Sequence, residues 1–180
     1  MTERKYPGAL SLIAWGTLLL FVNITVGNLN LLPNWLGYLL IYRALPAVGE
    51  EEPEAILLKP LCAALALWEG LLWLLLLFGT VLDWPVVRLA FSVIFLYFDF
   101  QLLSNLASTA LRHGCREERS LRRLRNIRAI LNTMLALPFG WEMVPYFSSV
   151  MIVVCLAAGL WTCCVLFAYR RSEEALGPAD

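Results

Sequence analysis

Two acidic side chains stand alone inside long apolar stretches of this sequence. Glu69 is the one charged residue of Pro60–Leu82, and Asp99 is the one charged residue of Leu89–Leu111. If these stretches are adjacent antiparallel helices joined near Asp83, both carboxylates lie about 21 Å from the turn, at matching depth. Two close carboxylates at low dielectric cannot both stay ionised cheaply, so they would share a proton or hold a cation. This pattern predicts the polar centre of a transporter or ion-conducting protein.

A structural alternative neutralises the acids with a basic side chain. Arg43 lies about 15 Å along an earlier apolar stretch, from where its side chain can reach inward. In that case the acids hold helices together, and the chain is a non-catalytic membrane component that packs against partner proteins. If the chain is a transporter, both acids should lie in one hydrated cavity. If it is a non-catalytic membrane component, the bundle should be dry and the acids neutralised.

The stretch that carries Asp99 has polar side chains on two faces. Arg88 and Ser92 fall within about 40° of Asp99 at 100° per residue. A second stripe on roughly the opposite side consists of Gln101, Asn105 and Ser108. We expect such a helix to be surrounded by other helices, where the stripes line an aqueous path or form interhelical hydrogen bonds of about 0.6 kcal/mol each.

A turn rich in amides follows the first apolar stretch. Its polar and helix-starting residues are Asn28, Asn30, Pro33 and Asn34. A helix that begins there would offer free N–H groups to an anion, or the amides would cap a hydrogen-bonded re-entry turn.

The composition excludes an ordinary soluble domain. Of the 180 residues, 60% are hydrophobic and only 16% are charged, against roughly half and a quarter in soluble globules. Mean hydropathy is +0.70. The five cysteines have no metal-ligand spacing, and no outward-facing disulfide framework is expected. His113 is the one histidine, and no nucleophile or phosphate-loop motif is present, so we expect neither an enzyme nor a cofactor.

The apolar runs predict an all-α integral membrane bundle of six transmembrane helices in one domain. The expected helices are about 8–26, 33–48, 56–81, 85–112, 118–138 and 144–170. With the N- and C-termini cytoplasmic, 13 of the 14 basic residues face inward and only Arg88 lies toward the outside, as the positive-inside rule requires.

The fifth helix is the weakest crossing in this scheme. Its uncharged run, from Ala129 to Phe139, has only about eleven residues. The pattern of residues 118–137 also fits an amphipathic helix that tilts into the membrane without crossing it. We favour a crossing, because otherwise Arg170 and Arg171 would lie outside. Three helices precede Asp83 and three follow it, so the two halves would have opposite orientations in the membrane. This arrangement is also consistent with an inverted repeat.

The basic segment before this helix sets orientation and offers a lipid-facing charge. The arginines that could contact anionic headgroups are Arg116, Arg119, Arg122 and Arg123, at about 1 kcal/mol each near the surface. Nucleic acid is not an expected partner, while a homo- or hetero-oligomer stays open.

The segment from Asn28 to Tyr42, NLNLLPNWLGYLLIY, resembles one in small uncharacterised membrane proteins of anaerobic Gram-positive bacteria. The matching residues are Leu32, Pro33, Gly37 and Tyr38, and Asn34 stands where that pattern commonly has Asp. The resemblance covers about a tenth of the chain. It implies a multi-pass protein of a bacterial plasma membrane and brings no activity, and the Asn weakens any cation site at position 34.

Overall fold

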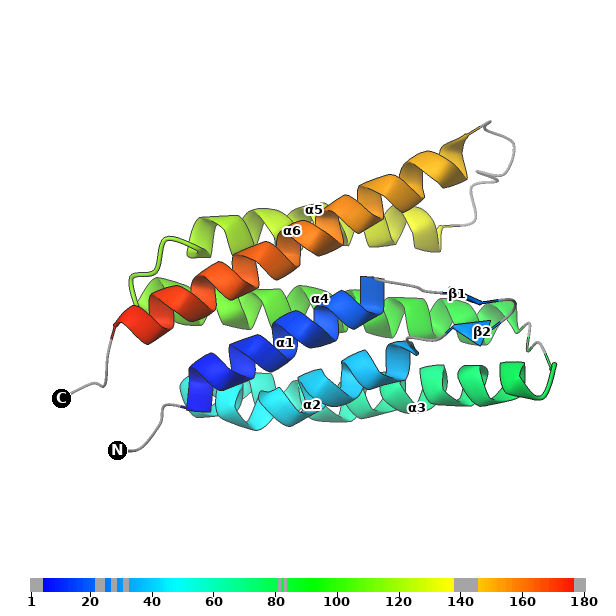
Figure 1. The fold of residues 1–180 in the computed structure, drawn as a ribbon, viewed down its shortest axis with the longest axis horizontal. Coiled ribbons are helices and arrows are strands. Elements are labelled where there is room, and N and C mark those ends of the chain that lie inside the picture. The colour runs from blue at the N-terminus through cyan, green and yellow to red at the C-terminus, as the bar shows by residue number, and fades with distance from the viewer. Residues whose placement is uncertain are drawn as a thin grey trace.

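The part of the chain that the structure describes folds into six α-helices that run along one common long axis (Figure 1). The computed structural model describes residues 5–21, 33–80, 82, 84–137 and 146–176, with the backbone of 25–26 and 29–30. The helices are α1 (Lys5–Phe21), α2 (Asn34–Glu51), α3 (Leu58–Leu77), α4 (Pro85–Arg112), α5 (Glu118–Ala136) and α6 (Phe147–Ala175). A 3₁₀ turn, η1 (Pro53–Leu57), joins α2 to α3. The predicted all-α class with six helices is confirmed.

The helices form a ring in sequence order. Each helix packs against the next one in the chain, and α6 returns to pack against α1. The start of α1, the end of α6 and the α4–α5 connection therefore lie at one end of the bundle (Figure 1); we call this the terminal end. Most of the basic residues that we expected on the inner side are near it.

Several helix ends differ from the prediction, and those of α1 and α2 have identifiable causes. Helix α1 ends at Phe21 rather than near residue 26, because Thr25–Val26 (β1) pairs antiparallel with Leu29–Asn30 (β2). Helix α2 continues through the exposed Pro46 to Glu51, three residues beyond its expected end near residue 48. Arg112 holds this last turn, since its guanidinium donates to the Glu51 carbonyl at 2.5 Å.

Helices α1 and α2 cross at two glycines. A Cβ on Gly16 would lie 2.7 Å from the Gly37 carbonyl oxygen, and a Cβ on Gly37 would lie 2.7 Å from the Gly16 carbonyl oxygen. Both contacts are too short for any side chain, so only glycine permits this backbone approach. The Phe21 ring of α1 packs against Gly159 of α6, where a Cβ would collide with it.

Within the described residues, three helical segments are long and apolar enough to cross a membrane. They are Pro53–Leu77, Pro85–Arg112 and Ser149–Ala175, with 25, 28 and 27 residues. Large apolar side chains of the first two face outward: Leu67 is 75% exposed and Val86 79%, and Phe78, directly after α3, is 82% exposed. A soluble monomer rarely exposes such a surface, whereas lipid covers it without cost. The remaining helices, α1, α2 and α5, are not among these three.

Candidate functional site

The polar centre of the bundle is an ion pair between α4 and α5. Arg128 Nη2 lies 2.5 Å from Asp99 Oδ1, and the two side chains are 4% and 9% exposed. Asp99 lies 14 residues into the 28-residue helix α4, which is its midpoint. An ionised pair at this position is costly unless each charge has a partner.

Two further helices complete the surroundings of Arg128. Its Nη1 donates to Thr162 Oγ1 of α6 at 3.3 Å, and its guanidinium carbon lies 4.6 Å from the centre of the Phe21 ring of α1. Thr162 in turn donates to the Ala158 carbonyl at 2.7 Å. The ion pair thus connects α1, α4, α5 and α6 at mid-height, and we call these four side chains, Asp99, Arg128, Thr162 and Phe21, the central cluster.

Glu69 does not belong to the central cluster, and this corrects the expected acid pair. Its Oε2 accepts a hydrogen bond from Asn34 Nδ2 at 3.1 Å. The rings of Trp68 on α3 and Phe91 on α4 are stacked with centroids 4.3 Å apart, which fixes the register of these antiparallel helices. In that register Asp99 lies about nine residues, or ~13 Å, from the level of Glu69. The prediction of matching depth counted almost the same helical rise from the turn at Asp83 to each acid. In the structure α3 ends at Leu77, only eight residues beyond Glu69, whereas Asp99 lies 14 residues after the start of α4.

The other residues predicted for the first polar face are also apart from the central cluster. Arg43 is exposed on α2, so the partner of Asp99 is Arg128 and the expectation for Arg43 is corrected. Arg88 is exposed near the start of α4, at the end opposite the terminal end. Ser92 donates to the Arg88 carbonyl at 2.9 Å, a bond within its own helix.

The second polar stripe makes hydrogen bonds rather than one continuous path. Gln101 Nε2 lies 3.3 Å from Asn105 Oδ1 and 3.5 Å from Glu54 Oε2. Asn105 is buried, while Ser108 is exposed. In the second half of α4, from Phe98 to Ala110, the buried residues cover one broad side, while Phe100 and Ser108 are exposed on the other. Neighbouring helices therefore cover this half of α4 in part and do not surround it.

The outer turn is described only in part. Asn28 lies outside the described residues, and Asn30 is placed by its backbone in β2. Pro33 is buried and precedes the first turn of α2, and Asn34 opens that turn. Its amide is committed to Glu69, which favours the hydrogen-bonded turn over an anion site.

A second polar cluster, at the terminal end, was not found from the sequence. His113 Nδ1 lies 2.7 Å from Glu173 Oε1, and its Nε2 lies 3.4 Å from Glu51 Oε2. The Cys115 thiol contacts the same Glu173 oxygen at 3.5 Å. Burial, then the charge and hydrogen bond of Glu173 and the charge of Glu117, raises the pKa of Cys115 to about 12.

This terminal cluster closes the ring of helices. Tyr6 on α1 and Tyr169 on α6 join their hydroxyls at 3.1 Å, and the Tyr6 ring lies edge-on to His113. Within the described residues, no group of three or more His, Cys, Asp or Glu has the arrangement of a metal site. The cluster therefore ties chain ends together through hydrogen bonds and charge.

The four arginines considered for lipid contact lie near the terminal end. Arg116 is in the α4–α5 turn, whereas the other three are on α5. All four are exposed, and Arg122 pairs with Glu118 one turn earlier. Their contact with anionic headgroups stays a prediction.

Neither a protein-family model, nor a curated protein, nor a solved structure matches this chain. The resemblance in the segment from Asn28 to Tyr42 therefore stays an expectation.

Proposed function

We propose that this chain is a non-catalytic, multi-pass component of a bacterial plasma membrane that works by packing against a partner. The observation that carries this proposal is that Asp99 and Glu69 have separate partners at separate depths. A cation or proton site built on both acids would need them within a few Å of each other. Their actual neighbours favour the role of holding helices in register.

The termini are proposed to be cytoplasmic and the six helices to cross the membrane. Three spans are supported by length and apolarity. The other three helices complete a ring that shields the charges of the central cluster, and the basic residues gathered at the terminal end favour an inward-facing location.

The test is thermal unfolding of the detergent-purified chain across pH, with a panel of monovalent and divalent ions and small solutes. A ligand that binds the folded state raises its stability by mass action. We expect that no ligand produces a saturable rise in the unfolding temperature that depends on the two acids. The double variant Glu69→Gln/Asp99→Asn should therefore respond to the panel as the wild type does. A shift present in the wild type and absent in the variant would overturn the proposal.

Proteoliposomes supply the second arm of the test. We expect a proton or cation gradient to decay at the same rate with the wild-type chain, with the double variant and in empty liposomes. A faster decay with the wild type alone would contradict the proposal and assign transport to the acids.

A second candidate function, transport of a small solute, is favoured by one specific observation. Arg128 Nε and Asn132 Nδ2 are buried donors one turn apart on α5, and neither has an acceptor among the described residues. Such donors would suit a carboxylate or phosphate group. Including small carboxylates and inorganic phosphate in the panel tests this candidate, since Asn132→Leu would abolish a shift that arises there.

A further inference from the structure

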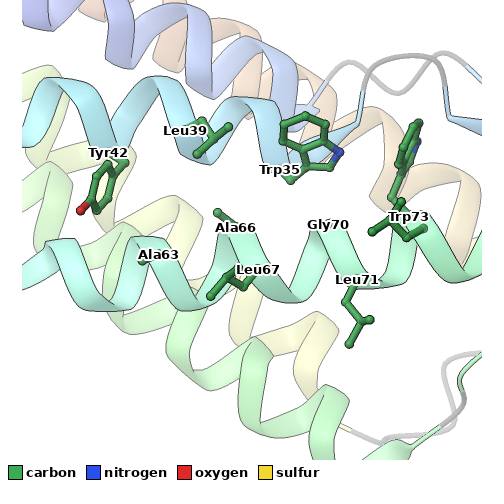
Figure 2. A pocket seen from close by; sticks show the side chains of 10 residues that line it. Trp35, Leu39, Tyr42, Ala63, Ala66, Leu67, Gly70, Leu71 and Trp73 are labelled. Atoms are coloured by element: carbon green, nitrogen blue, oxygen red, sulfur yellow. The ribbon is translucent and has the colours of Figure 1, made fainter.

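An apolar groove runs between α2 and α3 on the outside of the bundle (Figure 2). Its volume is about 650 Å³. Trp35 and Tyr42 of α2 form one wall, and small residues of α3, including Ala63 and Gly70, form the floor. Trp73 of α3 stands edge-on to Trp35, with ring centroids 6.3 Å apart, and closes the groove away from the terminal end.

The groove exists because small side chains on α3 face large ones on α2. A Cβ on Gly70 would meet only Trp35 atoms, at 3.8 Å or more. The helices are not separated along their whole length, since the Cys62 thiol donates to the Tyr38 carbonyl at 3.2 Å. The groove is therefore a local hollow in a packed helix pair.

The dimensions and chemistry of the groove match one hydrocarbon chain. From Ala63 to Leu74 the groove follows α3 for about 16 Å, close to half of the ~30 Å hydrocarbon core, which is the thickness of one leaflet. Its lining is almost entirely apolar, and Leu67, which also lines it, is 75% exposed. Because α3 belongs to a segment able to span a membrane, this surface faces lipid.

Charge distinguishes the two ends of the groove. At the end nearer the chain termini, the Lys59 ammonium lies 5.1 Å from the centre of the Tyr42 ring, and no carboxylate of the described residues is within ion-pair distance of it. Arg43, the next residue after Tyr42, is exposed. At the other end Asn34, the neighbour of Trp35, binds the Glu69 carboxylate. The carboxylates of the α2–α3 connection at the Lys59 end have partners of their own: Glu50 pairs with Lys5, Glu51 with His113 and Glu52 with Arg112, and Glu54 accepts a hydrogen bond from Gln101. Lys59 and Arg43 can therefore attract a negative headgroup at this end, whereas Glu69 repels it from the other.

We propose that the α2–α3 groove is a binding site for one anionic phospholipid of the cytoplasmic leaflet. The acyl chain lies along Ala63 and Gly70, beneath the rings of Trp35 and Tyr42. The phosphate lies beside Lys59 and Arg43. This site is independent of the central cluster and adds a lipid ligand to the proposed role.

The proposal is tested by competition between two phospholipids. The full chain is purified in detergent, mixed with equal amounts of phosphatidylglycerol and phosphatidylcholine of matched chains, and examined by native mass spectrometry. We expect one retained lipid with a preference for phosphatidylglycerol. Lys59→Gln should reduce that preference about fivefold, the factor that corresponds to ~1 kcal/mol for one basic residue. Arg171→Gln removes an exposed charge near the end of α6, away from the groove, and should leave the preference unchanged.

A variant that fills the groove separates the acyl chain from the headgroup. Gly70→Leu extends into the space beside Trp35 without a backbone clash and should lower retention of both lipids. Ala157→Leu adds the same bulk to an exposed position of α6 and serves as the matched control. Equal retention of the two lipids by the wild type, or a preference that survives Lys59→Gln, would overturn the proposal.

Bromine quenching provides a readout on the unmodified chain. Phosphatidylglycerol with brominated acyl chains should quench tryptophan fluorescence more than the matched phosphatidylcholine does, and Trp35→Phe/Trp73→Phe should remove that excess. The same quenching by both lipids contradicts headgroup selection. A dimer that Gly70→Leu converts to a monomer would assign the groove to a second copy and also overturn the proposal.

Discussion

The ion pair between Asp99 and Arg128 allows a quantitative test of what the central cluster does. The perturbation is a cycle of three variants: Asp99→Leu, Arg128→Met and the double substitution. Both replacements are apolar, and Met retains the length of Arg beside the Phe21 ring. Thr162 keeps an acceptor in every variant, because its hydroxyl already donates to the Ala158 carbonyl.

The expected magnitude follows from the geometry. At 2.5 Å and an effective dielectric constant of about 20, the attraction is ~7 kcal/mol. Removing two ions from water costs several kcal/mol each, so the pair as a whole contributes little net stability. Removing one partner leaves the other charge buried and unpaired, which costs about 3–5 kcal/mol. We expect each single variant to lose that amount and the double variant to unfold at the wild-type midpoint or above it.

The assay is unfolding of the purified chain in mixed micelles by a denaturing detergent, followed by circular dichroism. A double variant that loses the sum of the two single losses would contradict this expectation, because the two charges would then act independently. Lys5→Gln/Glu50→Gln serves as the control. That pair is 3.7 Å apart with side chains 73% and 62% exposed, so its removal should cost no more than about 1 kcal/mol.

Two further predictions concern positions outside the central cluster. Gly37→Ala should lower the free energy of unfolding by about 1–3 kcal/mol, since its methyl group meets the Gly16 carbonyl. Gly8→Ala is the control: it has open space around it and should stabilise the chain by up to ~1 kcal/mol. Equal effects of the two substitutions in the same unfolding assay would contradict the close crossing of α1 and α2. The raised pKa of Cys115, about 12, should make maleimide labelling of this thiol at pH 8 roughly a thousandfold slower than labelling of a free thiol of pKa ~8.5. Glu173→Gln should speed the labelling of Cys115. Labelling of Cys115 in the wild type at the rate of a free thiol would contradict its contact with Glu173. Because this pKa is raised on folding, the stability that the protonated thiol supplies is present below about pH 9 and is lost as pH rises toward 12.

The helices could be predicted because long apolar runs and their breakers are local signals. The limits of α4, Pro85 and Arg112, agree with the expected ones, since Pro begins the helix and a basic run follows its end. The end of α1 was missed, because the pairing of β1 with β2 depends on contacts that apolarity does not encode. Likewise, the register of α3 against α4 depends on the stacking of Trp68 on Phe91.

The acids were recognised from sequence, but their partners were not. Charge inside an apolar run identifies a buried carboxylate without indicating which helix supplies its partner, so Arg43 was chosen by depth alone. A better signal was present on α5, where Leu121, Leu124 and Arg128 are the buried residues. An arginine in register with an apolar stripe points inward, and it needs an acid there. His113 gave no comparable signal, because its partners Glu51 and Glu173 are about 60 residues away on either side.

The ion pair also bears on whether α5 crosses the membrane. If α4 spans the bilayer, Asp99 at its midpoint lies near the bilayer centre, and Arg128, 2.5 Å away, lies at the same depth. From Arg128 helix α5 extends about 15 Å toward its first residue and about 12 Å toward its last, together close to the ~30 Å hydrocarbon core. Arg125, one turn nearer the terminal end, has its own partners at this depth: its guanidinium lies 4.6 Å from the Phe100 ring centre and donates to Ser104 at 3.3 Å. The low apolarity of α5 is therefore compatible with a crossing, because its deepest charges are neutralised or solvated by α4 rather than by water.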